Sequence, residues 1–174
     1  MTETLSPTSA PSVASVLGDP RVIRAVGLAW HEADLLDRKQ YEAWKGLYAE
    51  DGLYVIPLDP ETEDFDHTLN MVYDDARMRD MRVTRMTEGY AIAAVDAART
   101  VRTVSRFIPV LVTDSEVTLR SAQVLVAYKR ENHDLWASEN TYTIRLSPLG
   151  DEIVKKVIRL IDSEGPVPAA GFLL

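Results

Sequence analysis

Apolar residues in the first third of the chain recur at steps of three and four, the spacing that places side chains on one face of an α-helix. Asp19 suits a helix N-cap, and Pro20 suits the first helical position, where the N–H that it lacks has no intrahelical partner. The pattern predicts a helix from there to about Asp37, with an apolar face made of Val22, Val26, Ala29, Trp30, Ala33 and Leu36. A second helix is predicted over about 40–49 by the same spacing of Tyr41, Trp44, Leu47 and Tyr48.

After the second helix the pattern changes to short runs of β-forming residues. Gly52 suits the left-handed position that ends a helix. The run GLYVIPL over 52–58 predicts a first strand, and an acidic loop over 59–66 follows it into solvent. Residues 71–73 are expected to form a short extended segment.

A third helix is predicted over about 75–88, with Asp74 as its cap, and residues 91–98 are expected to form a loop. The helix and the segment after it are rich in arginine for an acidic chain: Arg77, Arg79, Arg82, Arg85, Arg99, Arg102 and Arg106. Guanidinium groups bind carboxylates with paired hydrogen bonds and are enriched at interfaces. We interpret these arginines as a structural network or subunit-contact patch. The alternatives are local pairing with acidic neighbours on a solvated helix, or binding of a small anion.

The last part of the chain is rich in β-formers. Four runs separated by polar turns predict consecutive antiparallel strands over 100–112, 117–130, 135–146 and 153–161. In the last run, Val154, Ile158 and Leu160 point to one face with Lys156 as an exception, whereas Ile153, Val157 and Ile161 share the other face with Lys155 and Arg159. Both faces are therefore partly apolar. Helices first and strands last predict an α+β fold, in which a curved sheet packs one face on the helices and offers part of the other to another protein.

Length and composition predict one domain. Of 174 residues, those over 19–174 are expected to form the domain, and the Ser-, Thr- and Pro-rich stretch over 1–18 a flexible arm. The N-terminus lacks a basic segment followed by an apolar run, so we expect a soluble, cytoplasmic protein without a membrane anchor. The closing stretch over 165–174 is apolar and is expected to pack on a neighbouring subunit.

Charge and cysteine content exclude several classes of function. The net charge of −8 opposes binding to nucleic acid or to an anionic membrane. The absence of cysteine excludes disulfides, thiolate metal sites and cysteine-ligated iron–sulfur clusters. The three histidines, His31, His67 and His133, fall on a predicted helix, a loop and a turn, so we predict no metal site in this chain.

Two groups of residues could carry acid–base chemistry. His31 and Asp34 share a face of the first helix and could form a pair beneath the sheet, although a surface pair is the plainer interpretation. Tyr73, Asp74 and Asp75 place two carboxylates side by side, but adjacent acids at a helix start usually cap the first turn.

The order of short motifs resembles the small (beta) subunits of aromatic-ring-hydroxylating dioxygenases. The motifs are Tyr41-Glu42-x-Trp44-x-x-Leu47-Tyr48-x-x-Asp51, Tyr54 and Pro57, Tyr73-Asp74-Asp75 with Arg77, Arg82 and Arg85, and Arg99-Thr100-x-Arg102. The resemblance implies a nuclear-transport-factor-2-like, or cystatin-like, cone. It also implies structural or subunit-interface roles for Tyr41, Trp44, Tyr73, Asp74, Asp75, Arg77, Arg82, Arg85, Arg99 and Arg102.

For function, the resemblance implies a non-catalytic subunit that trimerises and supports large subunits in an α3β3 assembly. The large (alpha) subunits of this family carry a Rieske [2Fe–2S] cluster and a mononuclear Fe(II), and they receive electrons from a reductase, often through a ferredoxin. Two alternatives remain. The same cone also occurs in stand-alone isomerases and dehydratases, for which His31, Asp34 and Tyr48 would be the catalytic candidates here, and in binding modules without chemistry.

Overall fold

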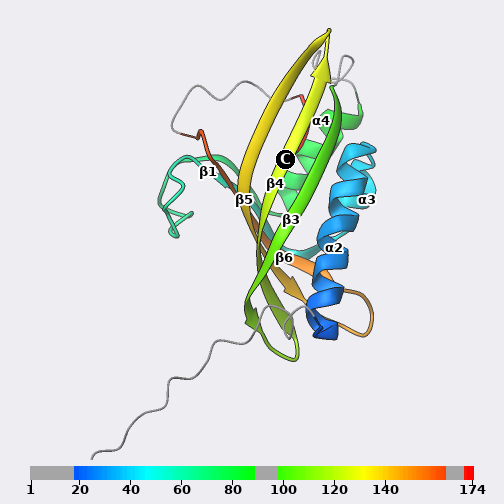
Figure 1. Cartoon of the computed structure of the whole chain (residues 1–174), viewed down its shortest axis with the longest axis vertical. Helices are drawn as coiled ribbons and strands as arrows, with labels where there is room; N and C mark the ends of the chain where they lie inside the picture. The colour runs from blue at the N-terminus through cyan, green and yellow to red at the C-terminus, as the bar shows by residue number, and fades with distance from the viewer. Residues whose placement is uncertain (1–17, 89–97, 164–170) are drawn as a thin grey trace, which may run out of the picture.

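A computed structural model describes residues 18–88, 98–163 and 171–174 of the chain (Figure 1). The helices are α2 (Pro20–Asp37), α3 (Tyr41–Lys45) and α4 (Ala76–Thr87). The strands are β1 (Tyr48–Pro57), β2 (Asn70–Asp74), β3 (Arg99–Val112), β4 (Glu116–Lys129), β5 (Asn132–Arg145) and β6 (Glu152–Leu160). The arm expected at the N-terminus and most of the loop expected over 91–98 lie outside the described residues. None of the helices in the described part is long and apolar enough to cross a membrane.

The strands form one sheet in the order β2-β1-β6-β5-β4-β3 among the described residues. All neighbours are antiparallel except β1 and β6, which are parallel. Figure 1 shows β3, β4 and β5 as long, twisted strands that run side by side, with α2 along one side of them. The predicted α+β fold with a curved, mostly antiparallel sheet is confirmed.

The second predicted helix is shorter than its spacing suggested. α3 ends at Lys45, and Tyr48 already belongs to β1. The helix ends early because the Leu47 carbonyl accepts a hydrogen bond from the Ile153 N–H at 2.8 Å instead of one from a later residue of the helix. This bond begins the pairing of β1 with β6. Gly52 does not end a helix. It lies where a Cβ atom would come within 2.8 Å of the Ile153 carbonyl oxygen, so the close approach of two strands requires glycine.

The cap of the third helix is also corrected. Asp75, not Asp74, is the N-cap of α4, and its side chain accepts a hydrogen bond from the backbone of Met78 at 2.8 Å. Asp74 instead ends β2, and it is only 1% exposed. Of two adjacent carboxylates, one therefore caps the helix and the other is free to pair with an arginine.

A β-bulge changes the facing of one residue at the start of β6. The register with β5 shifts between Thr143 and Ile144, so that Ile144 faces Ile153 while Thr143 faces Lys155. The extra residue brings Ile153 onto the inner face, where it is fully buried, and the prediction that it shares a face with Lys155 was wrong. Lys156, the apparent exception in the apolar pattern, does lie on the inner face, and it too is fully buried.

The core has two main parts on the inner face of the sheet. One lies between α2 and strands β4 and β5, and it contains Val22, Ala25, Val26, Ala29, Val117, Leu119, Tyr142 and Ile144. The other lies between α3, α4 and the part of the inner face formed by β1, β6 and other segments of β4 and β5, around Trp44, Tyr54, Leu125, Trp136 and Leu160. Leu173 and Leu174 belong to this second part, at 6% and 5% exposure. We call the space enclosed by α2, α3, the inner sheet face and residues 172–174 the cone interior.

Candidate functional site in the cone interior

A buried carboxylate lies between the two parts of the core. Glu32, on α2, is 0% exposed and accepts a hydrogen bond from four side chains. Its Oε1 atom accepts from Trp44 Nε1 and from the Tyr48 hydroxyl, both at 3.0 Å. Its Oε2 atom accepts from the Tyr142 hydroxyl at 2.9 Å and from Lys156 Nζ at 2.8 Å. Every oxygen of this carboxylate is thus used twice, as a buried charge requires.

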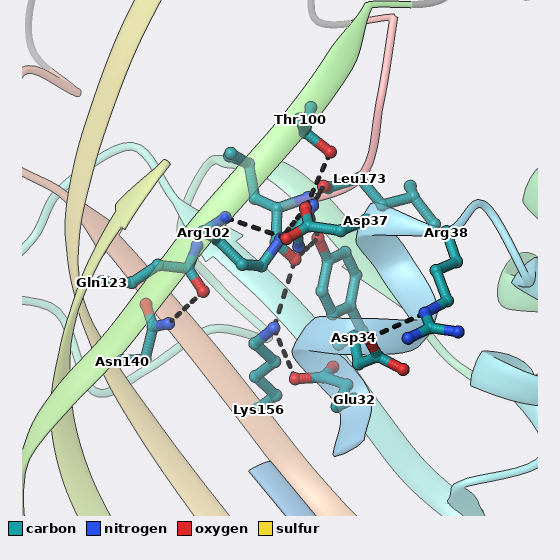
Figure 2. A network of polar contacts seen from close by, with 12 residues as sticks. Glu32, Asp34, Asp37, Arg38, Thr100, Arg102, Gln123, Asn140, Lys156 and Leu173 are labelled. Atoms are coloured by element: carbon teal, nitrogen blue, oxygen red, sulfur yellow. Dashed lines mark hydrogen bonds and ion pairs between the residues drawn. The ribbon is translucent and has the colours of Figure 1, made fainter. Parts of the chain in front are cut away.

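Lys156 is the counter-ion of Glu32 and is also fully buried (Figure 2). Its ammonium group donates to Glu32 and to the carbonyl of Leu174, the latter at 3.2 Å. The group also lies over two aromatic rings, 5.8 Å from the centre of Tyr54 and 5.3 Å from that of Tyr142. These contacts fix the Lys156 side chain in one position on the inner face of the sheet.

Burial shifts the pKa values of the groups around Glu32. It raises the pKa of the Tyr48 and Tyr142 hydroxyls well above the ordinary tyrosine value, and the nearby Glu32 charge raises them further. Burial lowers the pKa of Lys156, an effect that the Glu32 carboxylate opposes. Because the hydroxyls hold their protons tightly and already donate them to Glu32, they are poorly suited to exchange protons with a substrate.

A second polar cluster joins α2 to β3. The carboxylate of Asp37 accepts from the Thr100 hydroxyl at 2.7 Å, and from both Nε and the backbone N–H of Arg102 at 2.9 Å. Arg102 then donates from Nη2 to the carbonyl of Leu173 at 3.0 Å (Figure 2). The Arg102 side chain is 1% exposed, so it works as an internal connector between the helix, the sheet and the 172–174 segment.

The end of the described chain lies inside the cone. The Tyr54 hydroxyl donates to the Leu174 carbonyl at 2.9 Å and is 3.2 Å from the Leu174 nitrogen, which donates to it. Phe172 meets Trp136 edge to face, with ring centres 5.6 Å apart. The expectation that the apolar tail packs on a neighbouring subunit is wrong for residues 172–174, since they fill their own chain's interior.

The catalytic candidates of the alternative interpretation do not come together. His31 and Asp34 are both exposed, and Asp34 forms an ion pair with Arg38 at 2.8 Å. Tyr48 points inward and binds Glu32. The sequence carried a signal that we did not use, because Glu32 sits three residues after Ala29 and four before Leu36, and therefore interrupts the apolar face of the helix.

The arginines that follow the second strand divide into buried and exposed sets. Arg79 is 2% exposed, donates to the carbonyls of Gly52, Asp74 and Ala49, and stacks 4.5 Å from the centre of the Tyr48 ring. Arg82 forms a two-bond ion pair with the buried Asp74, which raises the pKa of the arginine. The exposed members are Arg77, Arg85, Arg99, which lies over the Tyr128 ring, and Arg106, which pairs with Glu139.

Two of the predicted aromatic positions anchor the core, and a third lies nearer the surface. Tyr41 and Trp44, both on α3, are 4% and 0% exposed, and burial raises the pKa of Tyr41. Tyr73, on β2, is partly buried and donates its hydroxyl to Asp66. That hydrogen bond raises the pKa of Tyr73.

Comparison with known proteins identifies the family. The family model described as "Ring hydroxylating beta subunit" matches residues 31–164. The chain belongs to this family of beta subunits. The small oxygenase component of the p-cumate 2,3-dioxygenase system of Pseudomonas putida is 33% identical to this beta subunit over 121 residues, which are 68% of this chain and 67% of that protein.

Solved structures support the same fold. The beta subunit of benzoate 1,2-dioxygenase from Burkholderia mallei superimposes with a TM-score of 0.71 at 20% identity, over 89% of this chain and 97% of that one. An NTF2-like protein with a cystatin-like fold from Novosphingobium aromaticivorans gives a TM-score of 0.58 at 19% identity, over 90% and 93% of the two chains. The predicted resemblance and the predicted cone are thereby confirmed.

The residues of this beta subunit do not fit a Rieske cluster. Such a cluster needs two cysteine and two histidine ligands, and the sequence has no cysteine. Within the described ranges, no group of three or more His, Asp or Glu side chains lies close enough to hold a metal ion. His67 hydrogen-bonds Asp64 in an exposed loop. His133, predicted in a turn, lies at the start of β5 and packs against Tyr128, its pairing partner on β4.

Proposed function

We propose that this chain is the non-catalytic small subunit of an aromatic-ring-hydroxylating dioxygenase. The observation that carries the proposal is the family match over residues 31–164. The contacts of the interior support a structural role. Glu32 and three of the groups that donate to it, those of Tyr48, Tyr142 and Lys156, belong to residues at most 7% exposed. The active site of a stand-alone isomerase or dehydratase would need such groups open to substrate.

The catalytic groups then belong to a partner. A large (alpha) subunit would hold the Rieske [2Fe–2S] cluster and the mononuclear Fe(II), receive electrons from a reductase or ferredoxin, and oxidise an aromatic compound. This chain would trimerise and support the large subunits in an α3β3 hexamer in the cytoplasm, as part of aromatic catabolism. Its acidic charge is consistent with a role that involves neither nucleic acid nor membrane.

An apolar area on the outer sheet face is the proposed contact with another subunit. Val101 on β3 pairs with Val126 on β4, which pairs with Leu135 at the start of β5. These three side chains are 71%, 40% and 69% exposed, and Val124 adds a further exposed apolar residue beside them. A contiguous apolar area on a sheet face usually marks a protein contact. The exposed Arg77 and Arg85 on α4 could add ion pairs with a partner's carboxylates.

The function is tested by expressing the chain alone and together with a candidate large subunit. We expect the chain alone to show no visible absorption from an iron–sulfur cluster and no oxygenation of aromatic compounds. We expect the pair to co-purify in equal amounts and to turn over with a reductase present. Turnover by the isolated chain, or failure to form a complex with any Rieske-type large subunit from the same genome, would contradict the proposal.

The outer-face contact gives a separate prediction. Leu135→Asp should leave the melting temperature of the isolated chain within a few degrees of the original, because the side chain is already exposed, but should reduce the mass of the assembly measured by light scattering. Leu149→Asp is the matched control, since Leu149 is fully exposed in the turn between β5 and β6. An unchanged assembly mass for Leu135→Asp would rule out this face as the contact.

A further inference from the structure

The 172–174 segment is held inside the cone like a bound ligand. Four different strands each contribute one side chain to it: Tyr54 from β1, Arg102 from β3, Trp136 from β5 and Lys156 from β6. The contacts are of two kinds. Trp136 meets an aromatic ring edge to face, whereas the other three donate hydrogen bonds to backbone carbonyl oxygens. The interior therefore recognises an aryl group and adjacent carbonyl acceptors.

Two buried hydrogen-bond donors beside this segment have no acceptor in the described part of the chain. Arg102 Nη1 and Trp136 Nε1 are buried and donate to no acceptor among the described residues. Both belong to one row across the inner face, because Arg102 pairs with Leu125 and Leu125 pairs with Trp136. Buried donors in proteins nearly always have an acceptor. Arg102 Nη1 and Trp136 Nε1 can therefore donate to an acceptor on a ligand that takes the place of residues 172–174.

The charges of the interior indicate which kind of acceptor fits. The cations Arg102 and Lys156 are each paired with a carboxylate, Asp37 and Glu32 respectively. These four side chains together carry no net charge before any ligand enters. An anionic ligand would add an uncompensated charge to a buried site, which is strongly unfavourable, whereas a neutral carbonyl group would not.

We propose that the cone interior is a binding site for a small neutral aryl carbonyl compound, and that residues 172–174 occupy this site as an intramolecular competitor. The ligand's ring takes the place of Phe172 against Trp136, and its carbonyl oxygen accepts from Arg102. This site is separate from the outer-face contacts of the proposed function and from any iron centre in a large subunit. It adds a ligand-responsive element to a subunit whose role is otherwise structural.

Residues 172–174, as the intramolecular competitor, set the apparent affinity of the site for its ligand. When the binding-competent state is only a fraction of the population, the apparent dissociation constant rises by the inverse of that fraction. Weakening the segment should therefore strengthen ligand binding. Leu173→Ala with Leu174→Ala removes the apolar packing of the segment but keeps its backbone, so the double variant should bind acetophenone about tenfold more tightly than the original chain.

The experiment is a calorimetric titration of the full chain with acetophenone, benzoate and ethylbenzene. We expect the double variant to gain affinity for acetophenone and to prefer it to both other compounds, since benzoate brings a charge and ethylbenzene has no acceptor. Leu119→Ala is the cavity control, because it opens space in the other part of the core, away from Arg102 and Trp136. That control should show no preference for the ketone over ethylbenzene.

A second measurement uses the unaltered chain. The Leu174 amide is hydrogen-bonded to Tyr54, so saturating acetophenone should release it and speed its hydrogen exchange at least about fivefold, while benzoate should not. The proposal fails if this exchange rate does not change. It also fails if a folded double variant binds acetophenone no more tightly than the original chain, or binds benzoate more tightly than acetophenone.

Discussion

Replacing Lys156 with alanine should lower the free energy of unfolding by about 3–5 kcal/mol, because it leaves the Glu32 carboxylate buried without its counter-ion. The substitution also removes a donor from the Leu174 carbonyl. Denaturant unfolding followed by circular dichroism measures the change. Lys155→Ala is the matched control, since the neighbouring lysine is only partly buried and its ammonium group lies 5.9 Å from the centre of the Phe65 ring. It should change the free energy of unfolding by no more than about 1 kcal/mol.

The partner substitution tests whether the loss comes from the unpaired charge. Glu32→Gln removes the charge and keeps hydrogen-bonding atoms, so the double variant Glu32→Gln with Lys156→Met should be more stable than Lys156→Met alone. A double variant no more stable than Lys156→Met alone would show that packing, not charge, dominates this position. His31→Ala, one residue away on the exposed face of α2, should have an effect within about 0.5 kcal/mol.

Stability should fall steeply above about pH 10, because the buried tyrosines hold their protons in the folded state and lose them when unfolded. Burial raises the pKa of Tyr48, Tyr54 and Tyr142 above the ordinary value of 10.0. Well below pH 10.0 these tyrosines are protonated in both the folded and the unfolded state, so the free energy of unfolding does not depend on them. Above it the unfolded state binds fewer protons, so each tyrosine lowers the free energy of unfolding by about 1.4 kcal/mol per pH unit, or about 4 kcal/mol for the three.

Lys156 changes the free energy of unfolding in the opposite direction, over a lower range of pH. Its pKa is lowered from 10.5 by burial, so between the lowered value and 10.5 the unfolded state binds the extra proton and stability rises with pH. Since three tyrosines outweigh one lysine, stability still falls above about pH 10, and Lys156 reduces the slope until about pH 10.5. Urea unfolding at a series of alkaline pH values, with tyrosinate absorbance as a second signal, measures the slope. Tyr54→Phe should reduce the slope by about a third, and a stability that stays constant across this range would contradict the burial of all three hydroxyls.

Much of the fold follows from periodicity and local chemistry. Three- and four-residue spacing located α2, and β-forming runs located β3 to β6 to within a few residues. The exceptions arise where a contact between distant residues replaces a local preference. Tyr48 continues a helical pattern, but pairing with β6 places it in β1, and a one-residue bulge reverses the facing of Ile153. Neither pairing can be deduced from the neighbouring residues.

In the candidate site, too, local patterns predicted some features and contacts between distant residues determined the others. The sequence placed Arg77, Arg79, Arg82 and Arg85 in the correct helix. It selected His31 and Asp34, which face solvent, in preference to Glu32 between them. A charged residue on an apolar face is interpretable only when its partner is known. For Glu32 the partners come from α3 and from three separate strands, up to 124 residues away.

By itself, the sequence determined the fold class, the family and the exclusion of a cysteine-ligated cluster, because these depend on local spacing, motif order and composition. Only the tertiary structure decided which charges are buried, which arginines are internal, and that residues 172–174 lie within their own cone. The physical reason is that burial and pairing are properties of surfaces brought together from distant parts of the chain. A carboxylate, a lysine and a carbonyl become one site only after the sheet has closed around them.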